Sequence, residues 1–94
     1  AREILEKIHK YYPQLQEVVE LLARIYLKKK EFSRAVDICK KYIIDIESST
    51  EMLFLTSSCL KRIGNYEEAI DLAERVKLRN PEHIRNLISL ADLY

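Results

Sequence analysis

The residues of this chain that could carry out chemistry form no pattern typical of a catalytic or metal site. Its two histidines, His9 and His83, lie near opposite ends of the sequence, whereas a zinc site needs three or four ligands. The sequence contains no HExxH motif, no glycine-rich phosphate loop and no Ser/His/Asp set that can be placed together. We therefore expect no catalytic residue, no bound metal and no cofactor, and we predict that the chain is not an enzyme.

The two cysteines, Cys39 and Cys59, lie within apolar patterns that are typical of helices. Two cysteines are too few for a disulfide scaffold, so we interpret them as buried, reduced thiols and expect an intracellular, cytoplasmic protein. No apolar run approaches the ~18–20 residues that a membrane-spanning helix needs, and no basic-then-apolar leader is present. We expect no membrane partner.

The charged residues indicate a solvated, ion-paired surface. Sixteen basic residues stand against 15 acidic ones, a net charge of +1, whereas a nucleic-acid-binding domain is usually strongly basic. The run Lys28-Lys29-Lys30 follows a helical pattern, where it complements the negative end of the helix dipole. RNA binding through this run and the pair Lys40-Lys41 is the less favoured alternative, so we expect nucleic acid not to be a partner.

The elements that position these residues are predicted to be α-helices alone. One glycine and two prolines leave little material for β-turns, and apolar residues recur at intervals of three and four. Pro13 ends the first helix, since the residue before a proline avoids the α region. The pattern predicts helices over about residues 1–12, 15–29, 33–44, 50–63 and 66–79, and a sixth with Pro81 near its first turn that runs to residue 94.

Capping residues mark several helix ends. Gly64, the single glycine of the chain, suits a left-handed C-terminal cap on the fourth helix. Ser48 followed by Glu51, and Asn65 followed by Glu68, fit capping boxes at the starts of the fourth and fifth helices. The second helix has a wider apolar face than a single stripe, so we expect it to have a neighbour on each of two sides.

Residues of the same size return at a constant interval along the chain. Ala1, Ala35 and Ala69 follow one another 34 residues apart, and an interval of this size is typical of stacked helical repeats. Helices approach to ~8–9 Å only where small side chains meet, so we expect such contacts at Ala35 and Ala69. The small residues on the partner helices are Ala23, Ser57 and Ala91.

These residues resemble the tetratricopeptide repeat family, whose 34-residue antiparallel helix pairs stack into a right-handed superhelix. The resemblance covers the whole chain and rests on the following residues: Ala1, Leu5, Ile8 and Pro13, then Val19, Leu22, Ala23, Tyr26, Phe32, Ala35, Cys39 and Tyr42, then Leu53, Thr56, Ser57, Leu60, Gly64, Tyr66, Ala69, Ala73, Val76 and Pro81, then Leu87, Leu90, Ala91 and Tyr94. It implies an all-α, α–α superhelix cut from a longer array. Residues 1–13 would be the second helix of a truncated repeat, 16–49 and 50–83 full repeats, and 84–94 the first helix of another truncated repeat.

The chain departs from the family pattern at several positions. Lys30 stands where the family has a turn glycine, and Glu47 stands where Pro13 would recur. Tyr42 is large where alanine is preferred, and Thr56 is polar where leucine is preferred. We expect these residues to alter local helix spacing and to leave the architecture unchanged.

In the family, one stripe of each first helix lines a concave face that binds peptides or helices of partner proteins. Carried over to this chain, the expected contact residues are Glu17, Glu20, Arg24, Leu27, Lys28, Glu51, Phe54, Ser58, Lys61, Arg62, Arg85, Ile88 and Asp92. Phe54 and Ile88 are not required by the repeat's own core, so they are candidate peptide anchors; alternatively, further helices or a second copy cover them. Only Arg85 matches the family's carboxylate clamp for chaperone tails, so we reject that specialisation.

The resemblance implies a protein–protein interaction module or scaffold that holds a partner peptide or helix in the groove of the array. The alternative is a self-associating array, a homo-oligomer joined through its open ends, because terminal repeats without a polar capping face expose apolar surface.

Overall fold

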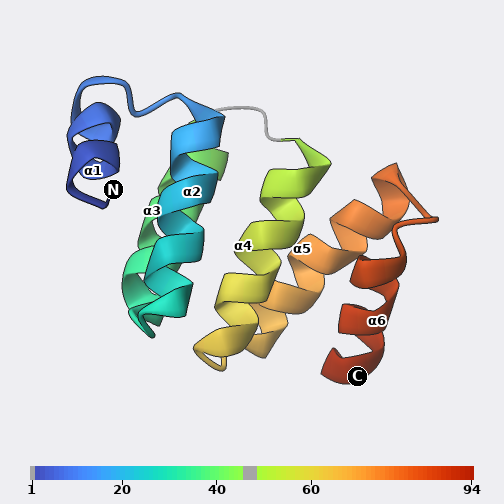
Figure 1. Ribbon diagram of the computed structural model, residues 1–94. Coiled ribbons are helices and arrows are strands. Elements are labelled where there is room, and N and C mark those ends of the chain that lie inside the picture. Colours follow the sequence, from blue (N-terminus) through green and yellow to red (C-terminus); the bar gives the residue numbers. More distant parts are fainter. Residues whose placement is uncertain (1, 46–48) are drawn as a thin grey trace. The chain divides into compact units, whose positions relative to one another are not determined.

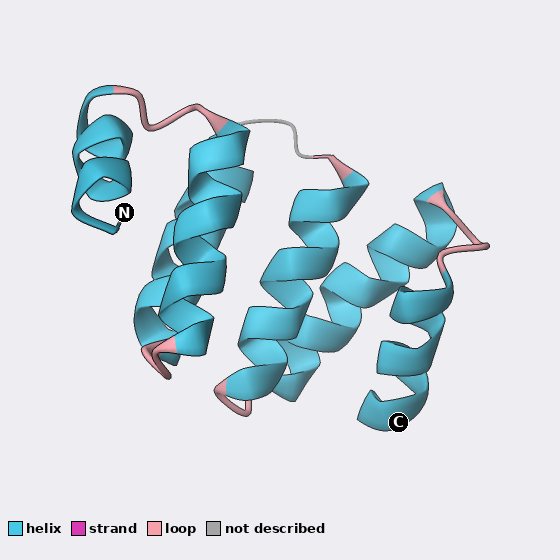
Figure 2. Cartoon of the chain, viewed as in Figure 1, coloured by secondary structure: helices cyan, strands magenta, loops and turns pink. Residues whose placement is uncertain are grey.

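A computed structural model describes residues 2–45 and 49–94, and over these residues it contains helices and turns but no strand (Figure 2). The all-α fold class is therefore confirmed. In chain order (Figure 1) the helices are α1 Arg2–Tyr11, α2 Gln16–Lys28, α3 Phe32–Asp45, α4 Thr50–Arg62, α5 Tyr66–Arg79 and α6 Ile84–Leu93. Among the described residues, no helix is both long enough and apolar enough to cross a membrane.

Pro81, predicted near the first turn of the sixth helix, lies in the turn that directly precedes α6. The backbone N–H of His83 donates to the carbonyl of Asn80 at 3.1 Å, so Pro81 occupies the second position of a turn, where its fixed φ is favoured. The helix begins only at Ile84, and His83 is its N-cap: ring atom Nδ1 accepts a hydrogen bond from the N–H of Asn86 at 3.0 Å.

Both predicted capping boxes differ from the structure. At α4 the cap is Ser49, whose hydroxyl accepts from the N–H of Met52 at 3.3 Å; the predicted cap, Ser48, lies outside the described residues. At α5 the side chain of Asn65 caps no backbone N–H, and its Nδ2 donates to Oε1 of Glu68 at 2.9 Å. The Asn65 backbone N–H, which Glu68 would accept in a capping box, instead donates to the Leu60 carbonyl at 3.0 Å.

The turns after α2 and α4 are two copies of one motif. Lys30 and Gly64 have φ values of 62° and 83°, so the left-handed cap predicted at Gly64 is confirmed and Lys30 adopts the same conformation. After each, the next N–H returns to the carbonyl five residues before it, Glu31 to Tyr26 at 2.8 Å and Asn65 to Leu60 at 3.0 Å. This is the bonding pattern of the Schellman motif.

The chain divides into two compact units, residues 1–47 and 48–94, which we call the N-terminal unit and the C-terminal unit. In the N-terminal unit, α2 packs against both α1 and α3, which confirms the prediction of neighbours on two sides. In the C-terminal unit, α5 packs against α4 and α6, and α4 also contacts α6. Cys39 and Cys59 are buried, one in each core.

Small residues are buried where the helices of each pair meet. Ala23, Ala35 and Ala69 are completely buried, as the interval of 34 residues predicts. Ser57, also buried, donates its hydroxyl to the carbonyl of Ala69 at 2.7 Å, which joins α4 to α5. Ala91, at the corresponding position of α6, is exposed and does not form the expected contact.

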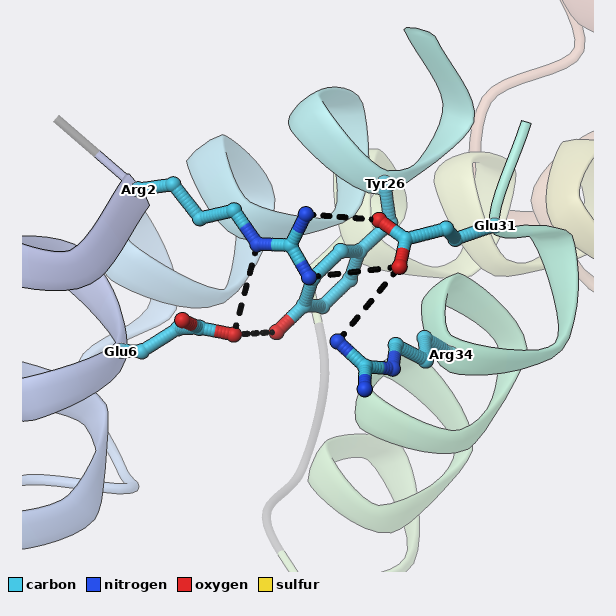
Figure 3. Close-up of polar contacts among 5 residues, drawn as sticks. All are labelled: Arg2, Glu6, Tyr26, Glu31 and Arg34. Carbon is cyan, nitrogen blue, oxygen red and sulfur yellow. Dashed lines mark hydrogen bonds and ion pairs between the residues drawn. The ribbon is translucent and has the colours of Figure 1, made fainter. Parts of the chain in front are cut away.

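Polar contacts help to attach α1, none of whose described residues is fully buried, to the rest of the N-terminal unit. The Tyr26 hydroxyl donates to Oε2 of Glu6 at 2.7 Å, and Arg2 pairs with Glu31 at 2.8 Å. Arg34 approaches Glu31 from α3 at 3.5 Å (Figure 3). Three helices and one turn therefore meet in a single network of hydrogen bonds and ion pairs.

Candidate functional site

The expected contact residues of α2 lie in the N-terminal unit along one helix. Arg24 pairs with Glu20 one turn away, at 3.7 Å between NH2 and Oε1. Glu17 and Lys28 are exposed, whereas Leu27 is half-buried. The arrangement is that of a charged, solvated helix surface, in which an i,i+4 ion pair contributes ~0.3–0.5 kcal/mol to stability.

In the C-terminal unit, the first helices α4 and α6 border a groove with a volume of about 910 Å³. All the expected contact residues of these two helices line it except Glu51. The lining residues are Phe54, Ser58, Lys61, Arg62, Tyr66, Arg85, Ile88, Ser89, Asp92 and Leu93. The structure therefore brings together side chains from two helices that are about a full repeat apart in sequence.

An aromatic and cationic cluster lies at one end of the groove. The ring of Phe54 is tilted against that of His83, with centroids 4.8 Å apart, and the guanidinium carbon of Arg85 lies 5.3 Å from the centroid of the Phe54 ring. Glu51, which does not line the groove, has Oε1 3.8 Å from Nε2 of His83. Phe54 is half-buried as a result, and less exposed than its sequence pattern suggested.

An ion pair spans the groove two helical turns further along. Nζ of Lys61 on α4 lies 3.1 Å from Oδ2 of Asp92 on α6. The two partners are unequally exposed: the Lys61 side chain is 33% accessible and that of Asp92 is 66% accessible. Lys61 is therefore held against the protein, while Asp92 approaches it from the solvent side.

Apolar and hydroxyl side chains lie between these two ends. Ile88 is 60% exposed, and Ser58 and Ser89, which also line the groove, are half-buried. Sequence reasoning missed Ser89 and Leu93, each one position beyond an expected residue, because it followed one stripe at helical spacing. It also missed Tyr66, which it assigned to the repeat pattern alone, and it gave His83 no role in the site.

Three residues of the network that attaches α1 have perturbed pKa values. The hydrogen bond from Tyr26 is the main cause that lowers the pKa of Glu6. Burial is the main cause that raises the pKa of Tyr26, and its hydrogen bond to Glu6 is the second. The hydrogen bond to Glu31 raises the pKa of Arg2. Within the part of the chain that the structure describes, no group of three or more His, Cys, Asp or Glu side chains is arranged to hold a metal ion.

Comparison with known proteins identifies the repeat type. The model of the family described as "Anaphase-promoting complex, cyclosome, subunit 3" matches residues 1–76. Two crystal structures of MamA share the fold with a TM-score of 0.89 each, at 22% sequence identity. The superpositions cover 99% and 100% of this chain but 54% and 51% of the MamA chains, so the chain spans about half their length. No curated protein sequence matches.

Proposed function

The chain belongs to the tetratricopeptide-type repeat family described as "Anaphase-promoting complex, cyclosome, subunit 3", and on this premise we propose that it binds a peptide or helix of a partner protein in the groove between α4 and α6. Repeat families of this type generally mediate protein–protein interaction and are generally non-catalytic scaffolds. The repeat boundaries at residues 16–49 and 50–83 are part of this proposal. The family's description names a multisubunit complex, which is consistent with a role in assembly.

The observation that carries the proposal is the composition of the groove. Exposed Ile88 and half-buried Phe54 are apolar side chains rimmed by charged and hydroxyl groups. Binding energy at interfaces is concentrated in a few buried aromatic or apolar anchors, with polar groups around them. A partner side chain inserted over Ile88 would bury apolar surface that now faces water.

A peptide-display selection tests this proposal. Peptides selected on the full chain are expected to lose at least about tenfold in affinity for a double variant, Phe54→Ala with Ile88→Ala, since truncation of hot-spot residues costs ~2 kcal/mol or more. The matched control is Leu78→Ala, which truncates an exposed leucine of α5 outside the groove. Selected peptides that bind the double variant and the control equally well would refute the proposal.

Self-association is the second candidate function, and the repeat register favours it. α4 packs against α5 and buries Leu53 and Leu60. Their counterparts 34 residues later are Leu87 on α6 and Tyr94 directly after that helix, and these are 37% and 79% exposed. α1 has the register of a second helix, and it exposes Ile4. A second copy that lays its α1 on α6 would complete a helix pair of the family type.

A further inference from the structure

The groove of the C-terminal unit carries more positive than negative charge. Its lining includes the cations Lys61, Arg62 and Arg85 and a single carboxylate, that of Asp92. A basic segment in this groove would be repelled by like charges, whereas an acidic segment would be attracted by opposite charges. The lining therefore selects by charge as well as by shape.

The ion pair across the groove provides a replaceable carboxylate. Asp92 is mostly exposed, whereas Lys61 is two-thirds buried, so the pair can open by movement of the aspartate into water while the ammonium stays in place. Exposed ion pairs contribute little to stability. A carboxylate of a bound ligand could thus take the place of Asp92 at Nζ of Lys61 without leaving either charge unsolvated.

The second cation contact lies at the aromatic end. The guanidinium carbon of Arg85 lies over the Phe54 ring, and the N–H groups of a guanidinium in such a cation–π contact can still donate hydrogen bonds to a carboxylate. From Phe54 to Lys61 is seven helical residues, or about 10 Å of rise. An extended segment of about three residues covers that distance, with its central side chain over Ile88.

We propose that the groove between α4 and α6 binds an extended acidic segment of a partner protein that carries one apolar side chain, and that Asp92 competes with this segment for Lys61. The inference rests on the proposed function, since it names the chemistry of the partner at the same groove. The apolar side chain contacts Ile88 and Phe54, while flanking carboxylates contact Lys61 and Arg85.

Fluorescence anisotropy with the full chain tests the proposal directly. The probe is a fluorescein-labelled peptide in which one leucine is flanked on each side by two glutamates; the controls replace the glutamates by glutamines or by lysines. The glutamate peptide is expected to bind at least about tenfold more tightly than either control, since charge-assisted hydrogen bonds are about twice as strong as neutral ones. Its affinity is expected to fall as salt screens the charges.

Two variants distinguish the role of Asp92, the proposed competitor, from that of Lys61, the cation that it pairs with. Asp92→Asn is expected to tighten binding of the glutamate peptide by about threefold to fivefold, and Lys61→Gln to weaken it by a similar factor, as the strength of partly exposed ion pairs implies. A gain in affinity cannot arise from misfolding. The matched controls are Asp71→Asn and Lys77→Gln, at exposed positions of α5 outside the groove, and both are expected to leave the affinity unchanged.

The outcomes distinguish this inference from the function on which it rests. If Asp92→Asn leaves the affinity unchanged or lowers it, the competition by Asp92 is refuted. If the glutamine peptide binds as well as the glutamate peptide, the acidic partner is refuted. If the glutamine or lysine peptide is the tighter ligand and Phe54→Ala weakens it, the groove still binds peptides and only the acidic chemistry falls. If none of the three peptides binds, while a display-selected peptide binds in the groove, the acidic inference is again overturned alone.

Discussion

At the scale of single residues, Lys30 and Gly64 provide a natural comparison. They occupy equivalent turns and both have positive φ, a conformation that costs an L-residue roughly 1–2 kcal/mol and glycine almost nothing. A Cβ added at Gly64 would meet no atom within 4 Å. The cost of a side chain at this turn therefore comes from the backbone alone.

Lys30→Gly is expected to stabilise the chain by about 0.5–1 kcal/mol, because removal of the left-handed strain outweighs the greater entropy of an unfolded glycine. Gly64→Ala is expected to destabilise it by about 1 kcal/mol for the same reason. Urea denaturation followed by circular dichroism measures both. Shifts of the same sign in the two variants would contradict this account of the turns.

Ala69 tests the close contact between α4 and α5. It is completely buried, and its carbonyl accepts the Ser57 hydroxyl, so Ala69→Leu is expected to cost ~1–3 kcal/mol by overpacking. The same enlargement at exposed Ala91 is the control and is expected to change little. Thermal midpoints of the two variants provide the measurement, and an unmoved midpoint for Ala69→Leu would count against the predicted packing.

At the scale of elements, α6 depends on an unusual N-cap. His83 caps the helix through its ring nitrogen and also packs its ring on Phe54. His83→Ala is expected to destabilise the C-terminal unit by ~1 kcal/mol, while His83→Asn, which preserves a capping acceptor, is expected to retain most of that stability. Hydrogen exchange of the α6 amides measures the effect. Equal losses in the two variants would show that ring packing, rather than capping, holds the helix start.

The attachment of α1 is expected to depend on pH in two steps. Burial is the main cause that lowers the pKa of His9, and the positive charge of Lys41 is the second. The unfolded histidine, with a pKa of ~6.5, therefore takes up a proton before the folded one, and stability falls as the pH drops below ~6.5. The lowered pKa of Glu6 stabilises the fold above the unfolded value of ~4.3, and this contribution is lost as the pH falls further.

Substitutions can assign each step to its residue. Thermal midpoints measured from about pH 8 to about pH 3 are expected to lose the upper step in His9→Gln and the lower step in Glu6→Gln, since those are the ranges in which these groups titrate. Tyr26→Phe removes the hydrogen bond to Glu6 and is expected to diminish the lower step while the upper one persists. An upper step that survives in His9→Gln would assign it to another group.

At the scale of the whole molecule, sedimentation velocity of two charged variants tests self-association. If α6 of one copy pairs with α1 of the next, Ile4→Lys and Leu87→Lys are each expected to abolish assembly of the chain in sedimentation velocity, because a charge is buried without a partner at the interface. An equimolar mixture of the two variants is expected to form a dimer, because one intact α6 and one intact α1 remain. A wild-type chain that stays monomeric at high concentration would exclude this function.

The sequence by itself determined the helices and their repeat. Apolar spacing, Pro13 and Gly64 act within one or two turns of chain, so the bounds of α5 were predicted correctly and those of α2 to α4 to within one residue. The recurring alanines identified the pairing of α2 with α3 and of α4 with α5, because small side chains are required wherever two helices approach closely.

Only the tertiary structure decided which side chains meet across helices. The pairs Lys61 with Asp92 and Phe54 with Arg85 join residues about thirty positions apart, and so does the contact of Arg2 with Glu31. Their distances depend on helix rotation and spacing, which local periodicity does not specify. The exposure of Leu87 on α6 was likewise decided by the tertiary structure. Leu87 occupies a core position of the repeat pattern but is 37% exposed, because burial requires a neighbouring helix as well as an apolar side chain.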